Sequence, residues 1–149
     1  MSFRNLTRSE QREQAFALVF EQIFNQAPVS ELIENAVEAR DLEVSDYVRE
    51  TAEGVAAHLE EIDREIERFI SARWQKSRIG KAALAILRLA IYEVELNPDV
   101  PTSVAINEAV ELAKKFASPE DAVFVNGLLG GLARSKDAEA AAPEEGVAE

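Results

Sequence analysis

The chain has 149 residues, of which 47% are hydrophobic, and this supplies enough apolar surface for one folded domain with a substantial core. Its 16 Lys and Arg residues against 28 Asp and Glu residues give a formal net charge of −12, which excludes a protein that coats nucleic acid through overall positive charge. The absence of cysteine excludes disulfide bonds and thiolate chemistry, and the single histidine excludes a multi-histidine metal site.

No segment of the sequence predicts export or membrane insertion. The N-terminal residues lack the apolar core of a secretory signal peptide. The most apolar run, residues 82–92, is shorter than the ~20 residues that a membrane-spanning helix needs, and Arg88 interrupts it. We therefore expect a cytoplasmic protein without a membrane partner.

Helical periodicity begins near the N-terminus. Apolar residues recur at helical spacing over residues 16–24, which predicts a first helix with one buried stripe. Arg8 and Arg12 lie one turn apart upstream on the same helix. After a break that contains proline, Ser30 is a candidate N-cap for a short helix ending near Arg40.

The middle of the chain continues the helical pattern. Ser45 is a candidate N-cap for a helix whose inner face runs over residues 47–59, and a break is expected near residues 60–63. Residues 74–77 read as a connection. Residues 79–92 are apolar on nearly every side of a helix, which predicts that this helix is central and surrounded by the others.

Two start signals divide the C-terminal part. Residues 97–101 contain strong turn signals, so the next helix is expected to begin at Thr102 or Ser103. Ser118 followed by Pro119, with acidic residues in the first turn, predicts the start of the last helix.

These patterns together predict an all-α fold. No alternation typical of a β-strand extends beyond a few residues. We expect a compact bundle of about six or seven helices in residues 1–135. Residues 136–149 are acidic and poor in bulky apolar side chains, so we expect them to form a disordered tail.

Motifs for catalysis and metal binding are missing from the sequence. It contains no glycine-rich phosphate loop and no Glu-x-x-His pair. The acidic residues 60–67 lack the pattern of a calcium-binding loop and alternate with Arg64 and Arg68, which is typical of a solvated helix face. We therefore expect no enzymatic activity, no cofactor and no metal site.

The N-terminal arginines are the first candidate binding feature. Arg4, Arg8 and Arg12 recur at a spacing of four and would form one edge suited to bidentate phosphate contacts. The alternative is that they serve solubility and pair locally with Glu10 and Glu13.

A second candidate combines cations, aromatic rings and a helix start. Lys114, Lys115 and Phe116 precede the helix N-terminus at Ser118, and Phe124 follows six residues later. Single-stranded RNA is bound by such mixtures, because bases stack on rings while phosphates contact cations. The alternative is that both phenylalanines belong to the core.

Charge is segregated along the chain. Residues 31–69 carry a net charge of −9, whereas residues 70–92 carry +5. Since screening limits the reach of each charge to about 8–10 Å, an acidic protein can still have a basic face. The positive segment could form a groove for a partner or simply balance the surface.

Two motifs resemble one known family. The segment Asp99-Val-Pro-Thr-Ser-Val-Ala-Ile-Asn-Glu-Ala-Val-Glu-Leu-Ala-Lys-Lys-Phe116, followed by Phe124-Val-Asn-Gly127, is similar to the bacterial transcription antitermination factor NusB family. The first helix, at Arg12-Glu13-x-Ala15, and the central helix, at Leu87-Arg88 and Tyr92-Glu93, agree with it. The resemblance covers residues 6–134.

The resemblance implies an all-helical fold of two packed three-helix subdomains. It also implies binding to the boxA element of ribosomal RNA leader transcripts as single-stranded RNA. Family members act with the small-subunit ribosomal protein that doubles as NusE, and the pair joins an antitermination complex on RNA polymerase.

Matching positions carry the family's site residues onto this sequence. Arg8 and Arg12 match the arginine-rich RNA motif, although it is sparser here than in members with consecutive arginines. Arg88 matches a position implicated in the NusE contact, and Ala83 stands where the family has a partner-facing acid. The full set of RNA-binding positions that the resemblance implies is Arg8, Arg12, Lys114, Phe116, Glu120, Phe124 and Asn126.

The leading hypothesis is a non-enzymatic adaptor that binds boxA-type RNA together with a NusE-like protein. A net charge of −12 predicts weak, salt-sensitive RNA binding by this chain alone and cooperative binding with the partner. The alternative is a helical protein-binding module, which could be a homodimer, without RNA recognition.

Overall fold

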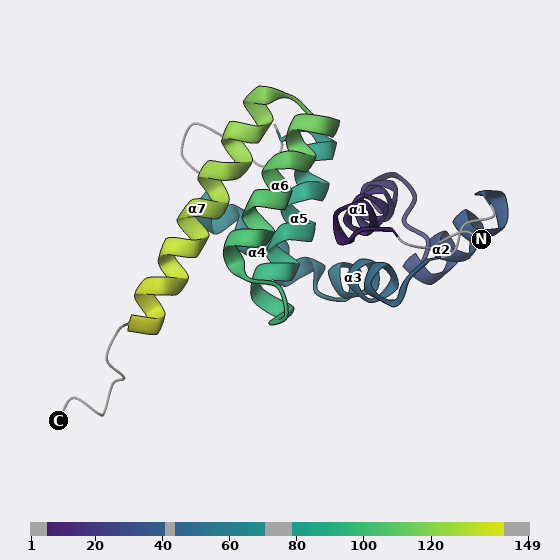
Figure 1. Ribbon diagram of the computed structural model, residues 1–149, viewed down its shortest axis with the longest axis horizontal. Helices are drawn as coiled ribbons and strands as arrows, with labels where there is room; N and C mark the ends of the chain where they lie inside the picture. Colours follow the sequence, from purple (N-terminus) through teal and green to yellow (C-terminus); the bar gives the residue numbers. More distant parts are fainter. Residues whose placement is uncertain (1–5, 41–43, 71–78, 142–149) are drawn as a thin grey trace.

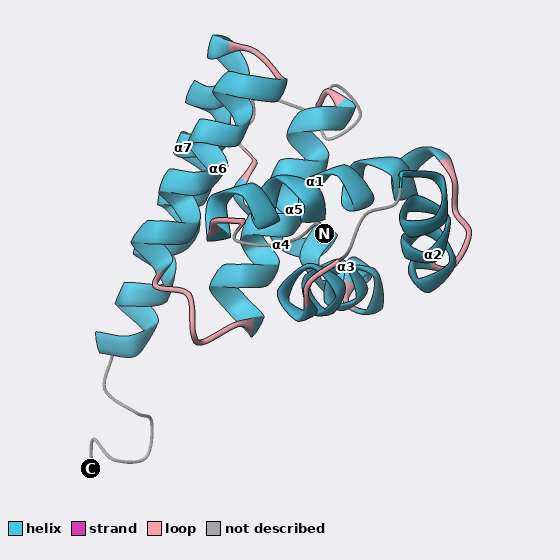
Figure 2. Cartoon of the chain, turned by 45° about the vertical axis from the view of Figure 1, so that its right-hand side comes forward, coloured by secondary structure: helices cyan, strands magenta, loops and turns pink. Residues whose placement is uncertain are grey.

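Seven α-helices form the part of the chain that the structure describes, which in this computed structural model comprises residues 6–40, 44–70 and 79–141. The helices are α1 (Arg8–Phe24), α2 (Val29–Arg40), α3 (Asp46–Ala57), α4 (Leu59–Phe69), α5 (Lys81–Leu96), α6 (Thr102–Phe116) and α7 (Pro119–Ala141). Figure 2 shows no strand among these described residues. The all-α prediction is confirmed. The connection expected at residues 74–77 lies outside the described residues.

Helix α5 lies at the centre, where it contacts α1, α3, α4, α6 and α7. Its buried side chains occupy nearly every face, as the absence of a polar side predicts. Figure 1 shows α1, α2 and α3 grouped on one side of the molecule and α4 to α7 on the other. These groups correspond to the two subdomains that the resemblance implied, with a fourth helix in the second group.

Side-chain caps set several helix starts. The Ser45 Oγ accepts a hydrogen bond from the Val48 N–H at 3.2 Å, and the Ser118 Oγ accepts one from the Asp121 N–H at 3.0 Å, which confirms both predicted caps. Ser30 is not a cap, because α2 begins one residue earlier. The break expected at residues 60–63 occurs at His58, which ends α3 and precedes α4.

Helix α7 extends further than the sequence predicted. It continues through residues 136–141, where a disordered tail was expected to begin. Alanines in this stretch have high helix propensity, and α7 is also anchored to α4. The Arg68 guanidinium lies 3.6 Å from Glu139 and donates a hydrogen bond to Ser135 at 3.4 Å. Residues 142–149 of the predicted tail lie outside the described residues.

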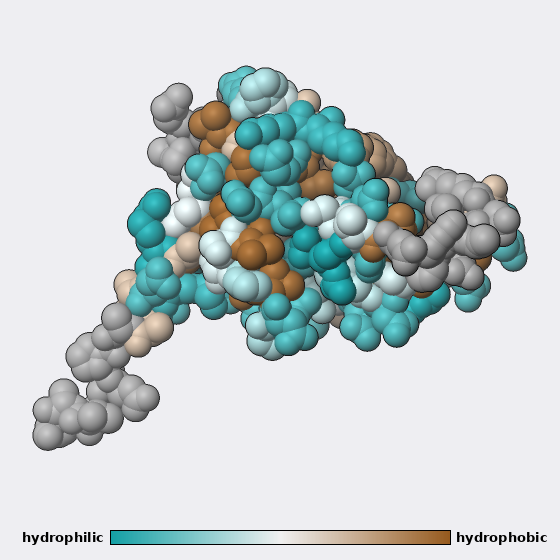
Figure 3. All heavy atoms as spheres, in the orientation of Figure 1, coloured by the Kyte–Doolittle hydropathy of each residue, from teal (hydrophilic) through white to brown (hydrophobic). Residues whose placement is uncertain are grey.

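Hydrophilic side chains cover much of the face seen in Figure 3, with hydrophobic side chains gathered over the α5–α6 part of the molecule. Leu96 and Val104, near the turn between these helices, are two of the exposed large apolar residues. In the described ranges, no helix combines the length and the hydropathy that crossing a membrane requires.

Candidate functional site

An open cleft of about 670 Å³ lies where the start of α1, the helix α3 and the α5–α6 turn meet. One part of its lining is charged and aromatic, and the other is apolar. The charged and aromatic lining residues include Arg8, Arg12, Tyr47, Glu50, Tyr92 and Asp99. The apolar lining residues are Leu96, Val100, Pro101 and Val104. The cleft therefore combines charged, aromatic and apolar side chains in one lining.

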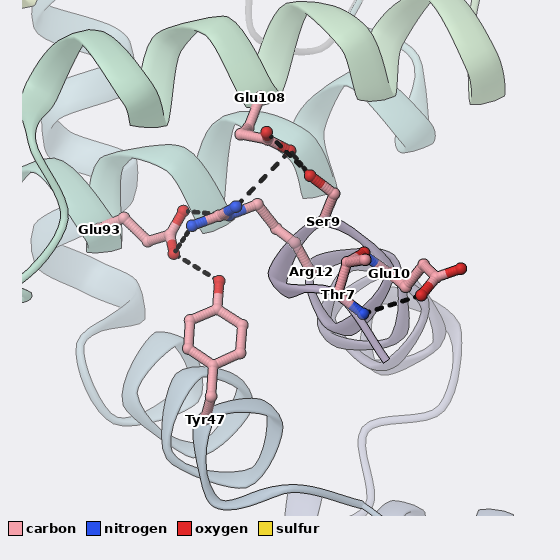
Figure 4. A network of polar contacts seen from close by, with 7 residues as sticks. All are labelled: Thr7, Ser9, Glu10, Arg12, Tyr47, Glu93 and Glu108. Carbon is pink, nitrogen blue, oxygen red and sulfur yellow. Dashed lines mark hydrogen bonds and ion pairs between the residues drawn. The ribbon is translucent and has the colours of Figure 1, made fainter. Parts of the chain in front are cut away.

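Arg12 lies at the buried base of this region. Its Nε donates to Glu93 Oε1 at 2.9 Å and its Nη2 donates to Oε2 at 3.0 Å, which makes a bidentate pair. The Tyr47 hydroxyl donates to the same carboxylate, and Glu108 lies 3.5 Å from Arg12 Nη1 (Figure 4). Arg12 and Glu93 are 3% and 1% exposed. The network joins α1, α3, α5 and α6.

This burial corrects the interpretation of the arginine edge. We expected Arg8 and Arg12 to form one exposed surface for phosphate, but the guanidinium of Arg12 is occupied by Glu93 and shielded from solvent. The physical reason is that Arg12 belongs to the inward stripe of α1, four residues before the buried Phe16. Arg4 lies outside the described residues.

The electrostatics keep the network in one protonation state. Burial acts to lower the pKa of Arg12, but the hydrogen bond and charge of Glu93 outweigh it, so the pKa of Arg12 lies above its ordinary value. Burial and the charge of Glu93 both raise the pKa of Tyr47. Arg12 therefore stays charged, and Tyr47 remains a hydrogen-bond donor at neutral pH.

The raised pKa of Tyr47 predicts loss of stability in alkali. The unfolded chain ionises this tyrosine near pH 10, whereas the folded protein keeps it neutral to a higher pH. The free energy of unfolding is therefore expected to fall above about pH 10, by up to about 1.4 kcal/mol per pH unit from this group. Urea unfolding between pH 8 and 11 measures it, and Tyr47→Phe should flatten the decline. The pKa of Tyr92 is also raised. Because wild type and Tyr47→Phe both contain Tyr92, its contribution is present in both measurements. If the free energy of unfolding fell equally steeply with pH in wild type and in Tyr47→Phe, the alkaline loss of stability could not be assigned to Tyr47.

Arg8 is the exposed cation of the cleft. It is the first residue of α1, because Thr7 caps the helix: the Thr7 Oγ1 accepts from the Glu10 N–H at 3.0 Å and Glu10 Oε1 accepts from the Thr7 N–H at 2.8 Å. The central guanidinium carbon of Arg8 lies 4.1 Å from the centre of the Tyr47 ring, which is a cation–π contact. Among the residues that the structure describes, no carboxylate forms an ion pair with Arg8.

A second, shallower hollow of about 350 Å³ follows the seam between α1 and α6 and includes Lys114. Across this seam, Ser9 donates to Glu108 at 3.0 Å and Lys115 contacts Glu13 at 2.7 Å. Lys114 is exposed and lies 3.4 Å from Glu111 on its own helix. Because these side-chain contacts join α1 and α6, Arg8 and Lys114 lie on two helices that meet at the seam.

The two phenylalanines that were candidates for stacking on RNA bases, Phe116 and Phe124, differ in exposure. Phe116 is 42% exposed, and its ring stacks on Phe16 with centroids 5.1 Å apart. Phe124 is 8% exposed and belongs to the core cluster, so the prediction that it offers a free stacking surface is wrong. Glu120 and Asn126 are exposed on α7, but neither lines the cleft or the hollow at the seam.

The two expected partner-binding residues lie on α5 and differ in burial. Arg88 Nε donates to Asp63 Oδ1 at 2.9 Å and Arg88 Nη2 donates to Oδ2 at 2.8 Å, and this pair braces α5 against α4. The Arg88 side chain is 11% exposed, so its contact with a partner stays a prediction. Ala83 is 1% exposed in the core and is not presented for a direct contact.

Sequence reasoning missed the residues that hold the arginines. Tyr47 was assigned only to an inner helix face, and Glu93 only to a family motif. One signal was available: Glu93 is an acid on the otherwise apolar buried face of one helix, and Arg12 interrupts the inward stripe of another. Opposite charges on two buried faces predict a pair. Among the described residues, no acidic or histidine cluster is arranged to hold a metal ion.

Comparisons with known proteins agree on one family. The model of the NusB family matches residues 9–134. The chain is 39% identical over 135 residues to the transcription antitermination protein NusB of Thermoanaerobacter sp. (strain X514), covering 90% of this chain and 95% of that protein. It is 44% identical over 131 residues to the protein of the same name from Acetivibrio thermocellus, covering 87% and 90%.

Solved structures show the same architecture. A crystal structure of the antitermination factors NusB and NusE in complex with dsRNA contains a chain that is 26% identical, with a TM-score of 0.75, covering 86% of this chain and 96% of that one. The solution structure of NusB from Aquifex aeolicus matches in fold with a TM-score of 0.75 at 24% identity, covering 94% and 96%.

Proposed function

Since this chain belongs to the NusB family of transcription antitermination proteins, we propose that it binds boxA-type single-stranded RNA of ribosomal RNA leader transcripts. It does so together with a NusE-like small-subunit ribosomal protein, in an antitermination complex on RNA polymerase. The protein is not an enzyme. A related NusB chain was solved with NusE and dsRNA, which supports RNA and a NusE-like protein as partners here.

The observation that carries the proposal is the exposed Arg8 in a cleft with aromatic walls. A guanidinium offers several N–H donors to phosphate, and the half-buried ring of Tyr92 in the same lining suits an unpaired base. Lys114 at the α1–α6 seam adds a second cation, and the exposed part of Phe116 adds a stacking surface. This combination fits single-stranded RNA better than a regular duplex.

The geometry refines the role of each proposed residue. Arg8 and Lys114 contact phosphates directly, whereas Arg12 holds the start of α1 against α5 through its buried ion pair with Glu93. Phe124 holds α7 in the core, and the exposed Glu120 and Asn126 extend the surface along α7. With a net charge of −12, this chain binds RNA weakly alone, and the partner supplies further positive surface.

An apolar hollow favours a second candidate function, binding to another protein. This hollow, of about 650 Å³, lies beside α1 and is lined by Phe16, Phe20, Phe24 and Phe116, with three glutamates of α1 in its lining. Phe24 is 62% exposed. Such a surface suits a partner helix or a second copy of the chain, and it needs no RNA.

Arg8→Ala is expected to weaken binding of boxA RNA about fivefold in the presence of the NusE-like protein, because one phosphate contact of about 1 kcal/mol is lost. The slope of log affinity against log salt should also become shallower by about 0.7. Fluorescence anisotropy with boxA and scrambled RNA at several salt concentrations measures both.

Arg64→Ala is the matched control, since it removes one exposed cation of α4 that does not line the cleft. It should leave affinity and salt slope unchanged. Unchanged affinity in Arg8→Ala would reject the site assignment. Absence of RNA binding by the wild-type chain with the NusE-like protein would favour the protein-binding module.

A further inference from the structure

The contact between Arg8 and Tyr47 has a role that the proposed function leaves open. We propose that Tyr47 is a positioning residue for RNA binding: its ring holds the Arg8 guanidinium in the orientation that receives phosphate. This inference rests on the proposed function, because it assumes that Arg8 contacts RNA. Tyr47 itself is buried and would contact RNA only through Arg8.

The Tyr47 ring is a fixed platform. Its hydroxyl donates to Glu93, and two hydrogen bonds from Arg12 hold that carboxylate in place. Both groups are buried: the ring cannot swing away without breaking its hydrogen bond to Glu93, and the carboxylate cannot move without breaking the three hydrogen bonds that it accepts. As Figure 4 shows, Tyr47 reaches the network from α3, whereas Arg12 reaches it from α1.

Arg8 needs such a platform because no described carboxylate forms an ion pair that would fix its guanidinium. A free arginine side chain loses conformational freedom when it is fixed, and a bound phosphate would have to compensate for that loss. The central carbon of the guanidinium lies over the ring, 4.1 Å from its centre. Its N–H donors lie in the guanidinium plane, at the edge, and remain free for phosphate.

The same cleft contains groups that would compete for Arg8. Glu50 and Asp99 both line it, and either carboxylate could pair with a freely moving guanidinium. An arginine paired in that way would present less positive charge to RNA. The contact with the Tyr47 ring favours an orientation of the Arg8 guanidinium without an ion pair. Arg8 can therefore present its positive charge to RNA although the protein as a whole is acidic.

A double-mutant cycle tests the proposal. Affinity for boxA RNA with the NusE-like protein is measured for wild type, Tyr47→Phe, Tyr47→Leu, Arg8→Ala and the double variant Arg8→Ala/Tyr47→Leu. Tyr47→Phe keeps the ring and should bind within about twofold of wild type. Tyr47→Leu removes the ring and should bind about two- to fivefold more weakly. In the double variant, the leucine should add no loss beyond that of Arg8→Ala.

Val48→Ala separates positioning from general stability. Val48 is fully buried in α3 beside Tyr47, so its truncation destabilises the same helix without removing the platform. It should lower the melting temperature and leave RNA affinity unchanged, with all binding measured where circular dichroism shows folded protein. If Val48→Ala weakens binding as much as Tyr47→Leu, the positioning role is overturned.

Free wild-type protein supplies a measurement that needs no leucine variant. Ring current from Tyr47 should shift the Arg8 side-chain proton resonances upfield, and Tyr47→Phe should preserve that shift. Random-coil resonances for Arg8 would overturn the proposal, as would additive losses in the cycle. If Arg8→Ala itself leaves RNA binding unchanged, the proposed RNA site fails; if only the coupling to Tyr47 is missing, this inference alone fails.

Discussion

Arg12→Ala is expected to lower the free energy of unfolding by about 3–5 kcal/mol. The substitution leaves the carboxylate of Glu93, which is 1% exposed, without the two hydrogen bonds and the charge of its partner. Tyr47 alone cannot replace them. A loss of this size is a large part of the 5–15 kcal/mol that stabilises a typical domain. Equilibrium urea unfolding measures it.

Two further variants decide whether the unpaired buried charge is the cause. Arg12→Met/Glu93→Leu removes both charges and should recover most of the stability, since well-packed apolar residues can replace a buried pair. Arg64→Ala removes a side chain that is 69% exposed, so it should change the free energy of unfolding by less than about 0.5 kcal/mol. A loss below about 1 kcal/mol in Arg12→Ala would show that the pair does not stabilise the junction of α1 and α5.

Gly54→Ala is expected to destabilise the protein by about 1–2 kcal/mol, although alanine is the better helix former. Replacing a glycine within a helix ordinarily gains about 0.5–1 kcal/mol. At Gly54, however, the added Cβ would overlap the ring of Tyr92 from α5, and relieving that overlap costs about 1–3 kcal/mol. Thermal and urea unfolding measure the difference.

Gly127→Ala is the matched control, because a Cβ at this position in α7 meets no atom within 4 Å. It should gain the ordinary 0.5–1 kcal/mol of a helix-interior alanine. A gain of similar size at Gly54 would mean that the Tyr92 ring moves aside freely. Since Tyr92 lines the cleft, such movement would also change the wall beside Arg8.

The structure assigns the two arginines of one helix face to different tasks. Arg8 and Arg12 are four residues apart, but one lies at the solvent edge of the cleft and the other lies below it. Glu93 neutralises the inner arginine and fixes Tyr47, and Tyr47 contacts the outer one. In the proposed RNA site, the buried pair would contribute through geometry, whereas the exposed arginine would contribute its charge.

Local pattern was sufficient for most helices. The apolar stripe of α1, the caps at Ser45 and Ser118 and the turn before Thr102 each depend on neighbours within a few residues, so the sequence predicted them closely. The end of α7 was missed because its last turns depend partly on Arg68, which contacts Glu139 from a distant helix.

The sequence by itself determined an all-helical chain with a central apolar helix, and its motifs pointed to the NusB family. Only the tertiary structure decided which charges face solvent. Arg12 and Phe124 are buried and Arg88 is partly buried in an ion pair, whereas Arg8, Lys114 and part of Phe116 remain accessible. The physical reason is that helical periodicity assigns a residue to a face, but burial of that face depends on helices far away in the sequence. A cation on such a face is free or neutralised according to whether packing brings a carboxylate to it.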